Sequence, residues 1–226
     1  CSSLGSGDFA GNPCDDIPTQ FIKIKEKMEH KWHGKFIAYF QANTNTYAPV
    51  SRLKELFESA LAQENVVGLS IATRADCLQD DAVNYLAELS HRTYLTVELG
   101  LQTIHDKTGE HINRCHTYAD FLNGYQKLRD KGINVCVHVI NGLPNETHEK
   151  MPETIKEISR LDIHSIKLHL LHVIKGTKIA EEYEKGEFEL LSLEEYVQII
   201  CDQIELLPPG VIIQRVTGDG DKNTLV

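Results

Sequence analysis

Short apolar runs alternate with longer amphipathic stretches along the chain, and this alternation predicts strands separated by helices. The short runs are rich in Val, Ile, Leu, Phe and Tyr, as is typical of buried strands, and occur at 36–41, 66–72, 94–99, 134–140, 165–173 and 211–216. Apolar residues at helical spacing predict helices at 17–32, 49–61, 80–90, 117–131, 146–161, 177–183 and 193–206. Residues 1–16 are rich in Gly, Ser, Asp and Asn and are expected to form a loop.

Strands that alternate with helices in this way pair in parallel through right-handed crossovers, as in an open doubly wound sheet or a barrel. Most of the predicted strands carry polar residues on one face, namely Tyr39, Gln41, Asn43, Ser70, Arg74, Thr96, Glu98, Cys136, His138, Lys167, His169 and Gln214 or Arg215. Between a sheet and covering helices, such groups would be buried without partners at about 1–3 kcal/mol each. We therefore predict an α/β fold in which about six parallel strands with outer helices form a partial TIM-like barrel, open at a seam between its end strands.

The composition limits the class of protein. The 226 residues include 23 basic and 33 acidic side chains, a net charge of -10, which argues against a surface coated for nucleic acid but leaves room for a local basic groove. No apolar run is long enough to span a membrane. Six cysteines without paired spacing favour a reducing, cytoplasmic location. The chain opens on Cys1 and not on Met, so we expect it to be part of a longer protein.

The stretch VELGLQT at 97–103 is the strongest local candidate for a binding site. Glu98 and Gln102 offer hydrogen-bond acceptors and donors at the end of a predicted strand, which suits sugar hydroxyls or an amino-acid head group. Gly100 between them permits a close approach of the backbone to a ligand. By itself this pattern also fits an ordinary strand end.

Several motifs together resemble a known family. They are VELGLQ at 97–102, INRCH at 112–116, HVINGLPNET at 138–147, FIAYFQANTNTYAP at 36–49 and LHVIKGT at 171–177. With them the whole chain resembles radical S-adenosylmethionine (SAM) enzymes related to the elongator catalytic subunit and oxygen-independent coproporphyrinogen oxidase. Within that family it is similar to the YhcC-like bacterial subgroup, described as Fe-S oxidoreductases.

The resemblance implies a radical SAM core domain over residues 1–226, truncated at both ends. Such an enzyme uses a 4Fe–4S cluster, held by three cysteines, to cleave SAM reductively and abstract hydrogen from a substrate. Cys1 is similar in position to the last of these three cysteines, and the other two would lie upstream, together with the first barrel strand. Cys14 does not match the spacing. We therefore expect no intact cluster on these 226 residues alone.

The resemblance also implies roles for individual residues around SAM. Asn43 and Thr44 would lie beside its amino group, Glu98 or Gln102 would bind its ribose, and Arg114 would pair with its carboxylate, with Arg74 as a weaker candidate. The backbone at Asn141 and Gly142 would approach the adenine, which the main chain of Val173 and Ile174 would sandwich. We expect Glu98, Gln102, Arg114 and the loop at 43–46 to converge on one cavity at the carboxyl ends of the strands.

The substrate and the catalytic residues beyond cofactor binding cannot be read from the motifs. RNA is a candidate substrate because the elongator relatives modify transfer RNA, and a flavodoxin or ferredoxin would supply the electron. Two alternatives stay open: a non-radical barrel enzyme acting on a small anionic metabolite, and a cluster-less SAM-binding scaffold. Two further cysteines shortly before Cys1 would favour the radical enzyme.

Overall fold

Six parallel strands form one continuous curved sheet in the computed structural model, which describes residues 11–28, 30–41, 43–218, 220 and 223–226. Neighbours in the sheet follow the order of the chain, from the first strand to the sixth. The strands are β1 (Phe36–Phe40), β2 (Val66–Thr73), β3 (Tyr94–Gln102), β4 (Asn134–Asn141), β5 (Ser165–Leu170) and β6 (Ile212–Arg215).

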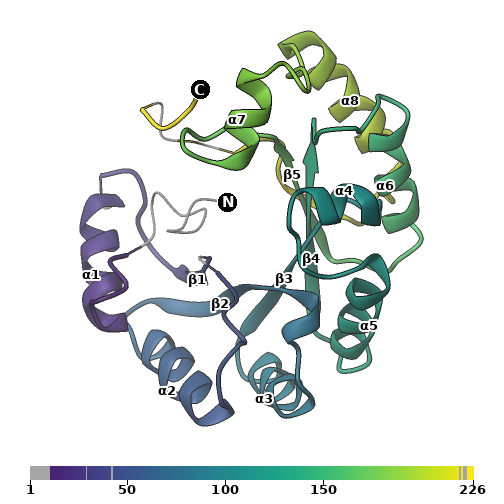
Figure 1. Cartoon of the computed structure of the whole chain (residues 1–226). Helices are drawn as coiled ribbons and strands as arrows, with labels where there is room; N and C mark the ends of the chain where they lie inside the picture. The colour runs from purple at the N-terminus through teal and green to yellow at the C-terminus, as the bar shows by residue number, and fades with distance from the viewer. Residues whose placement is uncertain (1–10, 29, 42, 219, 221–222) are drawn as a thin grey trace.

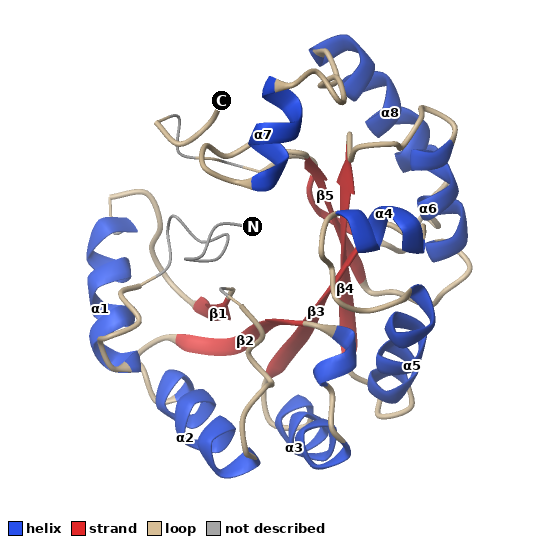
Figure 2. Cartoon of the chain, in the orientation of Figure 1, coloured by secondary structure: helices blue, strands red, loops and turns tan. Residues whose placement is uncertain are grey.

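The helices lie on the outer side of this sheet (Figures 1 and 2). They are α1 (Ile17–Met28), α2 (Val50–Leu61), α3 (Asp80–Ser90), α4 (Asp106–His111), α5 (Tyr118–Arg129), α6 (Lys150–Ile158), α7 (Lys178–Glu184) and α8 (Leu193–Glu205), with a short 3-10 helix η1 (Ala75–Cys77). No helix in the described ranges is long and apolar enough to cross a membrane.

The ring of strands is open. Within the described residues β1 pairs only with β2 and β6 only with β5, so the two end strands do not meet. Figure 1 shows the opening between α1 on one side and α7 on the other. The predicted partial barrel and its seam are therefore confirmed.

The hydrophobic core lies between the outer face of the sheet and the helices, and not inside the barrel. Leu69, Val97 and Val137 belong to the outward-facing set of their strands and are fully buried. They belong to the same apolar core cluster as helix residues such as Phe57 and Phe121. Because the core occupies the outer face, the inner face is free to carry polar groups.

Some element boundaries differ from the sequence-based prediction. The helix predicted over 17–32 ends at Met28, and the strand predicted over 165–173 ends at Leu170 because the chain then leaves the sheet. Instead, Ile174 forms a bridge with Leu225. The short helix α4 was not predicted, since its sequence DKTGEH has no apolar periodicity.

Candidate functional site

Glu98 is the centre of a polar cluster on the inner face of the barrel, although it is only 2% exposed. Its Oε2 accepts hydrogen bonds from the Tyr39 hydroxyl at 2.8 Å and from the Lys167 ammonium at 2.6 Å, and it lies 2.6 Å from Nε2 of His138. Its Oε1 accepts from Lys167 at 2.8 Å and from the Ser70 hydroxyl. We call these five residues the Glu98 cluster; the four partners come from β1, β2, β4 and β5.

The electrostatics of the cluster favour a carboxylate among cationic and neutral donors. Burial raises the pKa of Glu98, but the hydrogen bond and charge of His138, together with those of Lys167, outweigh it and hold that pKa well below its usual range. Burial, followed by the charge of Glu98, raises the pKa of the Tyr39 phenol, so the phenol stays protonated. The ammonium of Lys167 also lies 4.4 Å from the centre of the Tyr39 ring, a cation–π contact.

A second histidine lies next to the cluster. The rings of His138 and His169 are 5.3 Å apart, and the Nε2 atom of His169 is buried without a hydrogen-bond partner among the described residues. Burial, and then the charges of His138, Arg215 and Lys167, lower the pKa of His169 to about 3. His169 is therefore neutral near pH 7, with one ring nitrogen free to meet a ligand.

A cavity of about 400 Å³ extends from the Glu98 cluster toward the amino ends of the strands, and we call it the lower chamber. It is lined by Ile37, Tyr39, Ser70, Tyr94, Thr96, Glu98, His164, Lys167, Ile212 and Gln214. Tyr94 and Ile212 are the first residues of β3 and β6, and both are exposed, so the mouth lies at this end of the barrel. Thr96 lies deeper and is 1% exposed, and its Oγ1 has no hydrogen-bond partner in the described part of the chain.

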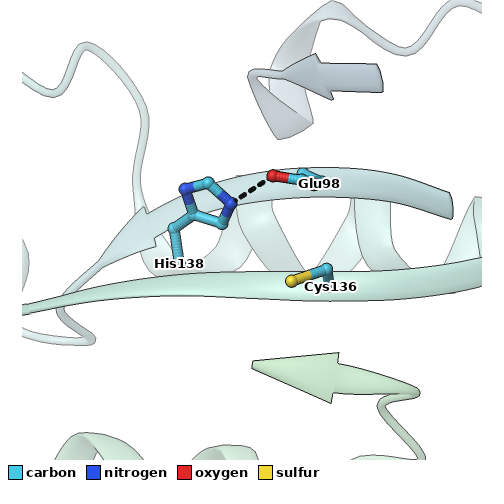
Figure 3. Close-up of side chains that lie close together, drawn as sticks. All are labelled: Glu98, Cys136 and His138. Atoms are coloured by element: carbon cyan, nitrogen blue, oxygen red, sulfur yellow. Dashed lines mark hydrogen bonds and ion pairs between the residues drawn. The ribbon is translucent and has the colours of Figure 1, made fainter. Parts of the chain in front are cut away.

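Cys136 adds a thiol beside the cluster. The ligand atoms of Glu98, Cys136 and His138 lie within 4.8 Å of one another, and Figure 3 shows the three side chains on neighbouring strands. Burial, and then the negative charge of Glu98, raises the pKa of this thiol to about 12. Metals bind thiolates, and Lys167 already neutralises Glu98, so this trio as it stands is a poor metal site.

Gln102 belongs to the predicted binding motif and is the last residue of β3. Its backbone has a φ of 68°, and the strand pairing shifts register between Gly100 and Gln102. A Cβ atom built on Gly100 would lie 2.8 Å from Nε2 of Gln102, so the glycine leaves room for this amide. Since Gly100 shares the inner face with Glu98, the side-chain amide of Gln102 reaches that face beside Gly100, nearer the carboxyl end of β3.

Arg114 is buried and holds the chain that follows β3. Its Nε donates to the carbonyl of His116 at 2.7 Å, and its Nη1 donates to the carbonyls of Leu101 at 3.1 Å and Thr103 at 2.5 Å. Its Nη2 pairs with Asp106 at 2.6 Å, and its side chain is 2% exposed. Each guanidinium nitrogen therefore already has a protein acceptor.

The three other polar candidates for contacts with SAM lie on loops. Arg74 makes a two-pronged pair with Asp76, at 2.9 and 2.6 Å, and donates to the carbonyl of Cys115 at 3.0 Å. Asn43 is exposed and has a φ of 61°, whereas Thr44 is half-buried.

The predicted adenine contacts are backbone positions around the ends of β4 and β5. The side chain of Asn141 is fully buried on the outer face, where it exchanges two hydrogen bonds with Gln203 on α8 at 2.8 and 2.7 Å. Gly142 has a φ of 80°, which glycine adopts without strain. The main chain at Val173 accepts a hydrogen bond from Val226 at 3.0 Å, and Ile174 pairs with Leu225.

Glu98 lines the lower chamber, whereas Gln102, Arg114 and residues 43–46 do not. Their predicted convergence on one cavity at the carboxyl ends of the strands stays a prediction. Cys1 lies outside the described residues. Sequence reasoning placed His138 and Lys167 on the inner face but did not select them as site residues; their alternation with buried apolar neighbours was the available signal.

The chain belongs to the radical SAM superfamily. Residues 10–158 match the Radical SAM superfamily and residues 163–226 match the Radical SAM C-terminal domain. It is 58% identical to uncharacterized protein YtqA of Bacillus subtilis over 97% of this chain and 69% of that protein. It is 36% identical to protein YhcC of Escherichia coli over 100% of this chain and 74% of that protein.

More distant relatives share part of the chain or the fold. The chain is 31% identical to the tRNA uridine(34) acetyltransferase of Methanocaldococcus jannaschii over 70% of its length and 29% of that protein. The solved structure of the archaeal Methanocaldococcus infernus Elp3 shares its fold with a TM-score of 0.81 at 23% identity, covering 93% of this chain and 55% of the Elp3 chain. The chain is thus a YhcC-like radical SAM enzyme sequence that spans about half of that Elp3 chain.

Proposed function

We propose that this radical SAM enzyme uses a 4Fe–4S cluster to cleave SAM reductively and to abstract hydrogen from RNA. The observation that carries the proposal is the half-barrel interior, where the Glu98 cluster meets a cavity of about 400 Å³. RNA is favoured as the substrate because a relative matched over 70% of this chain is named tRNA uridine(34) acetyltransferase. We propose residues 1–226 as the radical SAM core of a longer protein.

The cluster needs three thiolates close together. The free cysteines among the described residues are Cys14, Cys77, Cys115, Cys136 and Cys201, and the described residues hold no group of three neighbouring thiols. The described residues on their own therefore do not supply a cluster site. Cys1 stays a proposed ligand, together with cysteines outside this chain.

The residues proposed to hold SAM differ in how well their surroundings suit the task. Gln102 fits best, because Gly100 leaves its amide space on the inner face, where it could reach ribose hydroxyls. Asn43 and Thr44 are accessible and stay candidates for the amino group. The backbone at Asn141, Gly142, Val173 and Ile174 stays the proposed adenine contact.

The two arginines fit the SAM carboxylate less well. Binding there would require Arg114 to exchange one of its present acceptors for the ligand, at the cost of leaving a buried carbonyl without a donor. Arg74 would have to give up part of its pair with Asp76, which is partly exposed and therefore weaker.

Anaerobic reconstitution of the full-length protein tests the proposal. With iron, sulfide, SAM and a chemical reductant in place of flavodoxin or ferredoxin, we expect 5′-deoxyadenosine, measured by mass spectrometry. Added transfer RNA should raise its yield and undergo a mass change. An intact cluster that yields no 5′-deoxyadenosine would contradict the proposal, whereas SAM binding without any cluster would favour the cluster-less scaffold. Turnover of a small anionic metabolite without SAM would favour the non-radical enzyme.

A further inference from the structure

A basic stretch interrupts the acidic surface just before β1. Residues 23–35, KIKEKMEHKWHGK, contain five lysines and two histidines against two glutamates, in a chain of net charge -10. Lys23 and Lys25 form ion pairs with Asp15 and Glu64. The other three lysines, Lys27, Lys31 and Lys35, are exposed and have no carboxylate within 4.0 Å among the described residues. We call these three the lysine row.

An aromatic side chain lies within the same stretch. Trp32 is 61% exposed and immediately follows Lys31. Exposed lysines beside an exposed aromatic ring are typical of surfaces that bind single-stranded nucleic acid, because lysines contact phosphates and the ring offers a stacking face. A surface that is only charged and solvated would not need an exposed tryptophan, so Trp32 favours the nucleic-acid interpretation.

The last residue of the lysine row, Lys35, lies next to the lower chamber in sequence. Lys35 precedes β1, and Ile37, two residues later, lines the chamber. Tyr94 and Ile212, which also line it, are the first residues of their parallel strands and therefore lie at the same end of the barrel. A polymer bound to the row is thus placed at the amino end of the strands, where the chamber opens.

The interior of the lower chamber has the chemistry of a pocket for a flat polar group. The rings of Tyr94, at the mouth, and of Tyr39, at the level of Thr96, line it, and Gln214 contributes an amide. The buried hydroxyl of Thr96 has no partner in the described part of the chain and points to a missing hydrogen-bonding ligand. A buried hydroxyl without a partner costs about 1–3 kcal/mol, which a bound polar edge would recover.

We infer that the lower chamber receives one base of a single-stranded RNA segment whose phosphates contact Lys27, Lys31 and Lys35. The inserted base lies against a tyrosine ring and hydrogen-bonds to Thr96. The segment is single-stranded because a paired base cannot leave its helix without unstacking. This inference rests on the proposed RNA substrate and adds where and how the RNA is held.

The first test concerns the lysine row. Binding of a fluorescein-labelled transfer RNA transcript to the full-length protein is measured by anisotropy across a salt series. Changing Lys27, Lys31 and Lys35 together to Gln should weaken binding at least tenfold and lower the salt slope of the binding constant by about 2, since each phosphate contact contributes roughly 0.7–0.9. The matched control changes the exposed Lys107, Lys156 and Lys185 to Gln, and should leave the slope unchanged.

The second test concerns the chamber. Thr96→Val keeps the shape of the side chain and removes only the hydroxyl. It should weaken binding of the same transcript about fivefold, as expected for one hydrogen bond, without changing the salt slope. Its melting temperature, equal to or above that of the wild type, shows that the variant is folded.

The outcomes separate this inference from the proposed function. Wild-type protein that binds no transfer RNA would overturn the RNA substrate and this inference together, while SAM cleavage would still be measurable. If the wild type binds transfer RNA, and neither the lysine-row triple nor Thr96→Val weakens that binding, only the inference is overturned. Equal loss in the two lysine triples would reduce the row to general surface charge and would also overturn it.

Discussion

Glu98 illustrates how a single residue sets the character of the barrel interior. Both of its oxygens accept hydrogen bonds from neighbouring strands, and its charge is balanced by Lys167. A carboxylate held in this way is an organising group and not a free general base, because its lone pairs are occupied. It keeps Lys167 and the Tyr39 phenol at fixed positions at the edge of the lower chamber.

We predict that Glu98→Gln lowers the free energy of unfolding by about 3 kcal/mol, because it leaves Lys167 buried without its counter-charge. Urea unfolding monitored by circular dichroism measures this. The same change at the exposed Glu181 is the control and should alter stability by less than about 0.5 kcal/mol. A loss as small as that of the control would show that the cluster contributes little to the fold.

A second prediction at this scale concerns pH. The pKa of His169 falls from 6.5 to about 3 on folding, so the unfolded chain takes up a proton first as the pH drops. Stability from this residue is present above pH 6.5 and is lost as the pH falls from 6.5 toward 3. Between pH 7 and pH 5 we expect it to contribute a loss of up to about 2 kcal/mol. His169→Gln should make the unfolding free energy less dependent on pH over that range, and an unchanged pH profile would contradict the assignment.

At the scale of elements, the segment after β3 is held by its own buried arginine. Arg114 contacts backbone carbonyls at Leu101, Thr103 and His116, and it pairs with Asp106 at the start of α4. The side chain thus joins the end of the strand, the short helix and the turn into α5. Gly109 permits this packing, since a Cβ there would lie 2.7 Å from the guanidinium carbon.

We predict that Arg114→Ala lowers the free energy of unfolding by about 3 kcal/mol, because several buried carbonyls lose their donor. Arg160→Ala, which removes an exposed partner of Glu157, is the control and should cost less than about 1 kcal/mol. Thermal unfolding and SAM titration of the full-length protein are measured side by side. A stable Arg114 variant with weakened SAM binding would instead support the role that the family resemblance implies.

At the scale of the molecule, the alternation of apolar and polar residues was sufficient to predict the six strands and their inner face. Ser70, Glu98 and Lys167 could each be assigned to that face because side chains alternate along a strand. The partners of Arg114 could not be predicted, because they depend on how α4, which has no apolar periodicity, turns the chain back toward β3. The mouth of the lower chamber was also not predicted, because it depends on the curvature of the whole sheet, which the residue pattern of a single strand does not indicate.

The open sheet leads to a prediction for hydrogen exchange. Amides of β3 and β4 have strands on both sides and are covered by helices, whereas β1 and β6 each pair on one side only in the described chain. We expect the β3 and β4 amides to exchange slowest and those of β1 and β6 fastest, as measured by mass spectrometry of peptic fragments. Equal protection of all six strands would indicate that the two end strands are covered in solution.

The gap between β1 and β6 also leaves the width of the barrel open to adjustment. In the described chain each end strand has one edge without a neighbouring strand, and the backbone N–H and C=O groups along such an edge can pair with a further strand. A strand added at either edge would extend the sheet and narrow the opening between α1 and α7. The bore of the barrel therefore depends on what pairs with these two edges and not on the six strands alone.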